Sequence, residues 1–486
     1  MAEQSSILQR YPEYECTIGI EVHVQLNTKS KIFCTCSNEA VQEPNTNICE
    51  ICCGYPGVLP VLNKQVVHSA ILAGLATNCT ITPISEFARK HYFYPDLPKN
   101  YQITQSDKPV CQNGHLIIRL SDGSKKNIRL IRIHMEEDAG KNIHAGHTQE
   151  SFVDLNRTGT PLLEIVTHPD ISSAEEAKAY LKTLRLIVMY LNISTGNMQE
   201  GSFRADTNIS VRKKGDPKLG TRAELKNINS FKFIGDAIEY EIERQIDLLE
   251  SGKKVKQETR LWDTKEHISR PMRSKEEAAD YRYFEDPDLP LIEITQEMID
   301  AVKVTMPELP EQRFFRYCTQ HGISAYEADI LIEDPELCAY FEQASQYTSS
   351  KSLVNWILRD LMGLLKEEKI SLKECKITPE KLANLVDLLD KGIINNRGAQ
   401  EVFAIVAKTG QKPEDIVKEH GLEQIQSTDE IEKIIKEVIE KNPAQVAEYR
   451  SGKEKMFGFF VGQIMQKTQG KGNPKIIQEI LKKYLL

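Results

Sequence analysis

The sequence contains no run of about 18 apolar residues, so it offers no candidate for a membrane-spanning helix. Its first ten residues include Glu3 and Arg10 and lack an apolar stretch, and we therefore expect no secretory signal and a cytoplasmic location. The phosphate-binding pattern G-x-x-x-x-G-K-[ST] and the dinucleotide-binding pattern G-x-G-x-x-G are both missing. If the protein uses a nucleotide, its fold is therefore not one of the common ones.

Basic residues are outnumbered by acidic ones, 62 to 70, and the net charge is −8. This balance argues against a protein that coats nucleic acid along its whole length. The charge is uneven, because residues 441–486 hold nine basic residues and three acidic ones. An acidic body with a basic tail predicts that the tail alone contacts a polyanion.

The eleven cysteines are an odd number, which argues against a disulfide framework. Four of them form two close pairs, Cys34-x-Cys36 and Cys49-x-x-Cys52. Two such pairs supply the four thiolates of a structural zinc site, and Cys53 is then left over. The alternative is that all five are reduced thiols in a surface loop.

The 486 residues are enough for two to four domains, and the pattern of the chain changes near residue 295. Before this point, short alternating segments are broken by turn residues, whereas helical periodicity prevails after it. We expect an α+β protein with a mainly antiparallel sheet in residues 1–294. A helical domain over residues 295–410 and a basic helical tail over residues 411–486 would follow.

Strands are expected over residues 17–26, 127–138, 199–212 and 223–228. One helix should begin after Ser172 or Ser173, and a second should cover residues 231–249 and stop at Gly252.

Polar side chains share faces of these strands. Glu21 and His23 are two positions apart on one strand, and His134 and Glu136 on another. Glu164 lies within an apolar stretch, where an ionised carboxylate is costly unless it meets a cation or a donor. The remaining candidates are Glu200 and Glu224, with Arg204 and Lys226 among the accompanying cations. Carboxylates with an imidazole suit a site for Mg²⁺ and phosphate, and the alternative is that these are solvated faces of half-exposed strands.

Long motifs occur at residues 18–26, 55–63, 92–102, 134–141, 154–157, 161–166, 196–208, 223–230 and 452–474. In these stretches the sequence resembles the B subunits of tRNA-dependent amidotransferases. The resemblance covers nearly the whole chain and implies one component of a three-subunit enzyme, in which an amidase subunit releases ammonia from glutamine and a small bracing subunit holds the pair. It also implies a kinase-like domain similar in fold to glutamine synthetase.

The resemblance further implies a reaction. The B subunit uses ATP and Mg²⁺ to phosphorylate the side-chain carboxylate of Glu-tRNA(Gln) or Asp-tRNA(Asn), and ammonia then displaces phosphate. The implied Mg²⁺ ligands are Glu21, His23, Glu136 and Glu224, with Arg204 and Lys226 as nucleotide-binding residues. Zinc would bind Cys34, Cys36, Cys49 and Cys52. The helical region and the tail would contact the misacylated tRNA.

A second hypothesis is a zinc-containing tRNA-binding scaffold whose chemistry lies wholly in a partner. One departure from the family pattern is Glu285, which stands where members usually have proline. It predicts a looser loop near the site.

Overall fold

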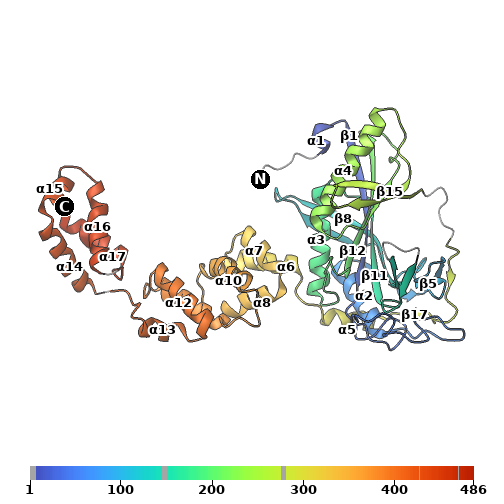
Figure 1. Cartoon of the computed structure of the whole chain (residues 1–486), viewed down its shortest axis with the longest axis horizontal. Coiled ribbons are helices and arrows are strands. Elements are labelled where there is room, and N and C mark those ends of the chain that lie inside the picture. Colours follow the sequence, from blue (N-terminus) through green and yellow to red (C-terminus); the bar gives the residue numbers. More distant parts are fainter. Residues whose placement is uncertain (1–6, 145–149, 275–280, 426, 469, 486) are drawn as a thin grey trace. The chain divides into compact units, whose positions relative to one another are not determined.

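The computed structural model describes residues 7–144, 150–274, 281–425, 427–468 and 470–485. The chain divides into two compact units, Met1–Pro310 and Glu311–Leu486 (Figure 1). The first unit is rich in strands and the second is helical. The expected α+β class, with a sheet followed by a helical region, is therefore confirmed.

Among the described residues, ten strands of the first unit form one sheet with the path β15-β14-β13-β12-β1-β11-β8-β6-β2, and β7 also pairs with β8. The long strand β1 (Tyr14–Gln25) lies at its centre, between β11 (Pro161–Thr167) and β12 (Phe203–Lys213). Residues of β1 alternate between buried and half-buried along its whole length, as their apolar and polar alternation predicts.

The strands of this sheet are mostly antiparallel, with one exception. β13 (Ala223–Lys226) runs parallel to β14 (Glu258–Asp263), and helix α4 (Phe231–Glu250) connects the two. A helical crossover is the usual connection between parallel strands, which explains the single departure from the antiparallel pattern.

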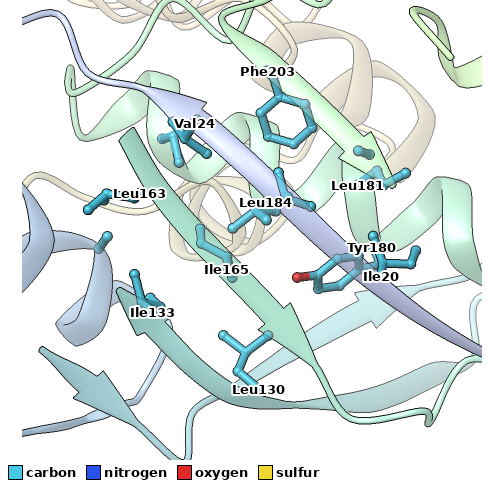
Figure 2. Packing of buried hydrophobic residues seen from close by; sticks show 14 of the residues in the cluster. Ile20, Val24, Leu130, Ile133, Leu163, Ile165, Tyr180, Leu181, Leu184 and Phe203 are labelled. Atoms are coloured by element: carbon cyan, nitrogen blue, oxygen red, sulfur yellow. The ribbon is translucent and has the colours of Figure 1, made fainter. Parts of the chain in front are cut away.

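Helices cover one face of the sheet. Helix α3 (Ala174–Tyr190) begins after the cap Ser173, whose side chain accepts a hydrogen bond from the Glu176 amide, and α4 begins after Ser230 in the same way. Figure 2 shows the apolar side chains of α3 and of the sheet packed together, among them Tyr180, Leu181, Leu184, Ile20, Val24 and Ile165. The opposite face of the sheet is thus left for polar side chains.

Apart from α2 and β8, which have 13 residues each, the other elements of the first unit are short. Its remaining helices are α1 (Ile7–Arg10), α2 (Lys64–Ala76) and α5 (Gln296–Val304). The remaining strands are β2 (Thr80–Ile81), β3 (Ile84–Ser85), β4 (Ala88–His91), β5 (Tyr101–Thr104), β6 (Cys111–Gln112), β7 (His115–Arg119), β8 (Lys125–Glu137), β9 (Lys141–His144), β10 (Ser151–Asp154), β15 (Ile268–Ser274), β16 (Phe284–Glu285) and β17 (Ile292–Glu293).

The second unit contains α6 (Pro310–Arg316), α7 (Ala325–Ile332), α8 (Pro335–Ala344), α9 (Leu353–Asn355), α10 (Met362–Glu368), α11 (Pro379–Asp390), α12 (Asn396–Thr409), α13 (Pro413–Glu419), α14 (Thr428–Lys441), α15 (Pro443–Arg450), α16 (Lys455–Lys467) and α17 (Pro474–Leu485). Two π-helical stretches, Tyr317–His321 and Trp356–Leu361, lie between them. The apolar faces of α14, α16 and α17 form a core of their own.

One strand begins later than expected, and two other expectations stay predictions. The first compact unit includes Val302 of α5 in its core, and the divisions expected at residues 294 and 410 stay predictions. The strand expected from residue 199 begins at Phe203, since Asn197 accepts hydrogen bonds from the amides of Gln199 and Glu200 and holds a turn there. Glu285 lies in β16, which pairs with β4, and the looser loop stays a prediction.

Candidate active site and metal centres

Three neighbouring strands bring an imidazole and two carboxylates together on the face of the sheet opposite α3 and α4. In the strand register, His23 on β1 lies opposite Glu164 on β11, and Glu164 lies opposite His134 on β8. The Nε2 atom of His23 is 3.3 Å from Glu136 Oε1 and 3.5 Å from Glu164 Oε2. One donor atom from each of His23, Glu136 and Glu164 lies within 4.8 Å of the others, which suits a bound metal ion.

Ion pairing decides the charge state of this cluster. Burial alone would lower the pKa of His23, but hydrogen bonds and charge interactions with Glu136 and Glu164 outweigh it and raise the pKa to about 10. His134, whose Nε2 is 3.0 Å from Glu164 Oε2, has its pKa raised to about 9 against the effect of burial. Burial would raise the pKa of Glu136, yet its bonds to His134 and His23 lower it to about 2.

The two buried carboxylates are thus ionised and balanced by imidazolium groups. A divalent cation would supply the same compensating charge, and carboxylate oxygens are the ligands that Mg²⁺ prefers. Loss of the His23 proton would add a third donor atom. The side chains present therefore fit a divalent cation.

A second polar group lies beside this cluster. Burial, followed by the negative charges of Glu164, Glu224 and Asp206, raises the pKa of Glu21. The Nζ atom of Lys226 is 2.6 Å from Asp206 Oδ2 and 3.1 Å from Glu224 Oε1. The expected set of four ligands is therefore split. His23 and Glu136 join Glu164, whereas Glu224 contacts the Lys226 ammonium and Glu21 accepts a hydrogen bond from the Asn208 side chain at 3.3 Å.

Arg204 lies opposite His23 on the neighbouring strand β12. Its guanidinium is 3.0 Å from Asp138 Oδ2, and Asp138 is only 6% exposed. Arg204 is thus held at the rim of the cluster. Glu200, by contrast, is exposed in the turn before β12 and does not join the site.

The four cysteines expected to bind zinc also converge. The Cys52 sulfur is 3.3 Å from that of Cys34, 3.6 Å from that of Cys49 and 3.7 Å from that of Cys36. A tetrahedron with zinc–sulfur bonds of about 2.3 Å places its sulfurs about 3.8 Å apart, so these four thiols fit zinc. Cys53 lies outside the group.

Buried Lys31 accompanies this thiol cluster. Its Nζ atom donates to the Asn47 carbonyl at 2.9 Å and lies 3.6 Å from the Cys52 sulfur. The hydrogen bond from Cys34, aided by the Lys31 ammonium, lowers the pKa of the Cys52 thiol to about 4. A thiolate is therefore favoured at Cys52, as metal binding requires.

Both parts of the chain match models of known protein families. Residues 16–300 match the family model described as the GatB/GatE catalytic domain, and residues 339–485 match the one described as the GatB domain. The chain belongs to the GatB family. Within the described ranges, no helix combines the length and the apolar character needed to cross a bilayer.

Full-length GatB relatives are highly similar. The B subunit of the aspartyl/glutamyl-tRNA(Asn/Gln) amidotransferase of Geotalea daltonii is 54% identical over 477 residues, which cover 97% of this chain and 99% of the relative. The proteins of the same name from Thermodesulfovibrio yellowstonii and Myxococcus xanthus are 51% and 50% identical, each over 97% of this chain and 99% of its own length.

The expected set of metal ligands does not include Glu164, and it gives His134 no role. The signal for Glu164 is its position inside the apolar stretch of residues 162–166. The signal for His134 is its spacing of two from Glu136. Neither signal identifies a partner, because the partners are set by the strand register.

Proposed function

We propose that this GatB chain is the ATP-using subunit of an aspartyl/glutamyl-tRNA amidotransferase. Its full-length relatives carry that name and support the assignment. Its substrates are ATP and the side-chain carboxylate of Glu-tRNA(Gln), Asp-tRNA(Asn) or both, and its partners are an amidase subunit and a small bracing subunit. Its location is the cytoplasm. Structural zinc in the thiol cluster completes the proposal.

The reaction has two steps. A carboxylate oxygen of the aminoacyl group attacks the γ-phosphorus of ATP, the bond to the β-γ bridging oxygen breaks, and ADP leaves. Ammonia from the amidase subunit then attacks the activated carbonyl carbon, the bond to the phosphate oxygen breaks, and inorganic phosphate leaves. Mg²⁺, when bound, neutralises charge on the phosphates during transfer.

The convergence of His23, Glu136 and Glu164 on the polar face of the sheet supports this proposal. These side chains would hold the cation, and Glu21 and Glu224 would extend the acidic site toward a second position. Lys226 and Arg204 contribute positive charge beside the carboxylates and are suited to contact phosphate oxygens. Phosphoryl transfer needs this combination of anionic ligands and nearby cations.

The proposal is tested in the reconstituted three-subunit complex with glutamine, ATP and each misacylated tRNA. His23→Ala should abolish ATP-dependent amide formation and leave tRNA binding and the glutaminase activity of the partner intact. His68→Ala on α2, outside the cluster, is the matched control and should behave as the wild type. Unchanged amide formation by His23→Ala would favour the alternative of a tRNA-binding scaffold.

A further inference from the structure

Two buried threonines donate hydrogen bonds to carboxylates of the candidate active site. Thr259 on β14 is 6% exposed, and its hydroxyl donates to Glu224 Oε2 at 2.7 Å. Thr104 on β5 is 2% exposed, and its hydroxyl donates to Glu136 Oε2 at 3.1 Å. The two threonines come from different strands and reach different carboxylates.

In both pairs the threonine contacts Oε2 of the carboxylate, while Oε1 contacts a positively charged side chain; Glu136 Oε2 is also 3.7 Å from His134 Nε2. Glu136 Oε1 is 3.3 Å from His23 Nε2, and Glu224 Oε1 is 3.1 Å from Lys226 Nζ. A hydroxyl donor fixes the rotation of a carboxylate without cancelling its negative charge. It therefore leaves the Oε1 atoms charged and oriented.

Strand pairing places Thr259 beside its carboxylate, whereas bonds that involve side chains join the strand of Thr104 to β8. Thr259 lies directly opposite Glu224 in the parallel pair of β13 and β14. The strand that carries Thr104 is joined to β8 by two further bonds, from the Ile103 amide to Glu137 Oε1 and from the Gln102 amide group to the Glu137 carbonyl. Both threonines therefore lie on strands that are tied to the strand of the carboxylate they contact.

We infer that Thr104 and Thr259 are positioning residues that orient Glu136 and Glu224 for a divalent cation. The inference rests on the proposed function, because it takes the acidic site to be a cation site. Valine matches threonine closely in shape and in preference for strands, but it lacks the hydroxyl. A purely structural role in the strand would therefore be served by valine, whereas orientation of a carboxylate would not.

Mn²⁺ binding to the assembled complex, followed by its paramagnetic resonance signal, tests the inference without relying on activity. Thr104→Val and Thr259→Val should each raise the Mn²⁺ dissociation constant by about tenfold, as loss of an outer partner of a metal ligand does. Thr104→Ser and Thr259→Ser should restore it to within about twofold.

Thr207→Val is the matched control. Thr207 lies on β12 of the same sheet, is fully buried, and its hydroxyl has no hydrogen-bond partner among the described residues. Its replacement should leave Mn²⁺ binding unchanged. If a valine variant does not fold, alanine is used at the same position. The alanine variant is expected to bind Mn²⁺ as the valine variant would.

These binding measurements distinguish failure of the cation site from failure of the positioning role of the threonines. If the wild type binds no Mn²⁺, or if His23→Ala binds it as tightly as the wild type, the proposed cation site itself is wrong. If His23→Ala loses Mn²⁺ but the valine variants keep the wild-type affinity, the positioning role is overturned and the site stands. Serine variants that bind as weakly as the valine variants would also overturn the role of the hydroxyls.

Discussion

Glu164 lies on β11 between Leu163 and Ile165, both of which are fully buried. Charge interactions and hydrogen bonds with His134 and His23 outweigh its burial and hold its pKa well below the usual range. The carboxylate is thus charged in a place where charge is costly. Such a group is expected where a protein needs a fixed negative charge, as a cation site does.

Replacing Glu164 by glutamine keeps the size of the side chain and removes its charge. We expect ATP-dependent amide formation to fall by about a hundredfold or more, because stabilisation of charge during phosphoryl transfer is worth several kcal/mol. The rates of amide formation and of glutamine hydrolysis in the same complex check this, and the second rate should not change.

Glu15→Gln is the control for this substitution. Glu15 lies on β1, on the same face as His23 but eight residues away from it, and it pairs with Arg212. It should retain the wild-type rate. A Glu164→Gln complex that forms amide as fast as the control would contradict the assignment of Glu164 to the site.

At the level of helices and strands, periodicity in the sequence is enough to predict which side chains of one strand share a face. The alternation over residues 17–26 places Glu21 and His23 together, and β1 has that alternation. The pairing of β1 with β11 is not predictable, because residues 25 and 162 are brought together by the fold and not by any local pattern. The same reason explains why Glu164 is missing from the expected ligand set.

A network of buried polar side chains connects α4 to the sheet. Glu241 is fully buried and accepts hydrogen bonds from Arg244 at 2.6 Å and from Gln245 at 2.8 Å, and Arg260 of β14 is 3.6 Å away. Its neighbour on the same helix, Glu243, makes an exposed ion pair with Arg10. The two glutamates lie on the same helix but face different environments.

Glu241→Ala should lower the free energy of unfolding of the first unit by about 3 kcal/mol, because it removes the buried carboxylate that accepts hydrogen bonds from Arg244 and Gln245. Glu243→Ala should change it by less than about 0.5 kcal/mol, as is usual for an exposed pair. Denaturant unfolding of the full chain measures both, and equal effects of the two substitutions would contradict the importance of the buried network.

The thiol cluster yields a prediction about metal content. Elemental analysis of the purified protein should find one zinc ion per chain, and Cys52→Ser should lose it, because Cys52 is within 3.7 Å of all three other sulfurs. Cys53→Ser, outside the cluster, should keep the ion. Wild-type protein without stoichiometric zinc would mean that these cysteines are reduced thiols.

At the scale of the whole molecule, the chain combines an acidic sheet-containing unit with a helical unit that ends in a basic tail. The tail has its own apolar core, to which α14 contributes Ile431 and Ile435. A truncation after residue 442 would expose these side chains. Charge neutralisation is therefore the better way to examine tRNA contacts of the tail.

A triple variant with Lys455, Lys471 and Lys475 changed to glutamine should bind tRNA more weakly, and its affinity should depend less on salt. Each lost phosphate contact should reduce the slope of log affinity against log salt by about 0.7 to 0.9. Binding measured over a series of salt concentrations checks this. A slope identical to that of the wild type would show that these lysines do not contact phosphate.

The central claim is that this chain, and not its partner, activates the aminoacyl carboxylate with ATP. The most direct measurement is amide formation on Glu-tRNA(Gln) and Asp-tRNA(Asn) by the assembled complex with ammonium chloride in place of glutamine, since added ammonia bypasses the amidase subunit. We expect ATP-dependent amide formation by the wild type and none by His23→Ala. Amide formation by His23→Ala at the wild-type rate would contradict it.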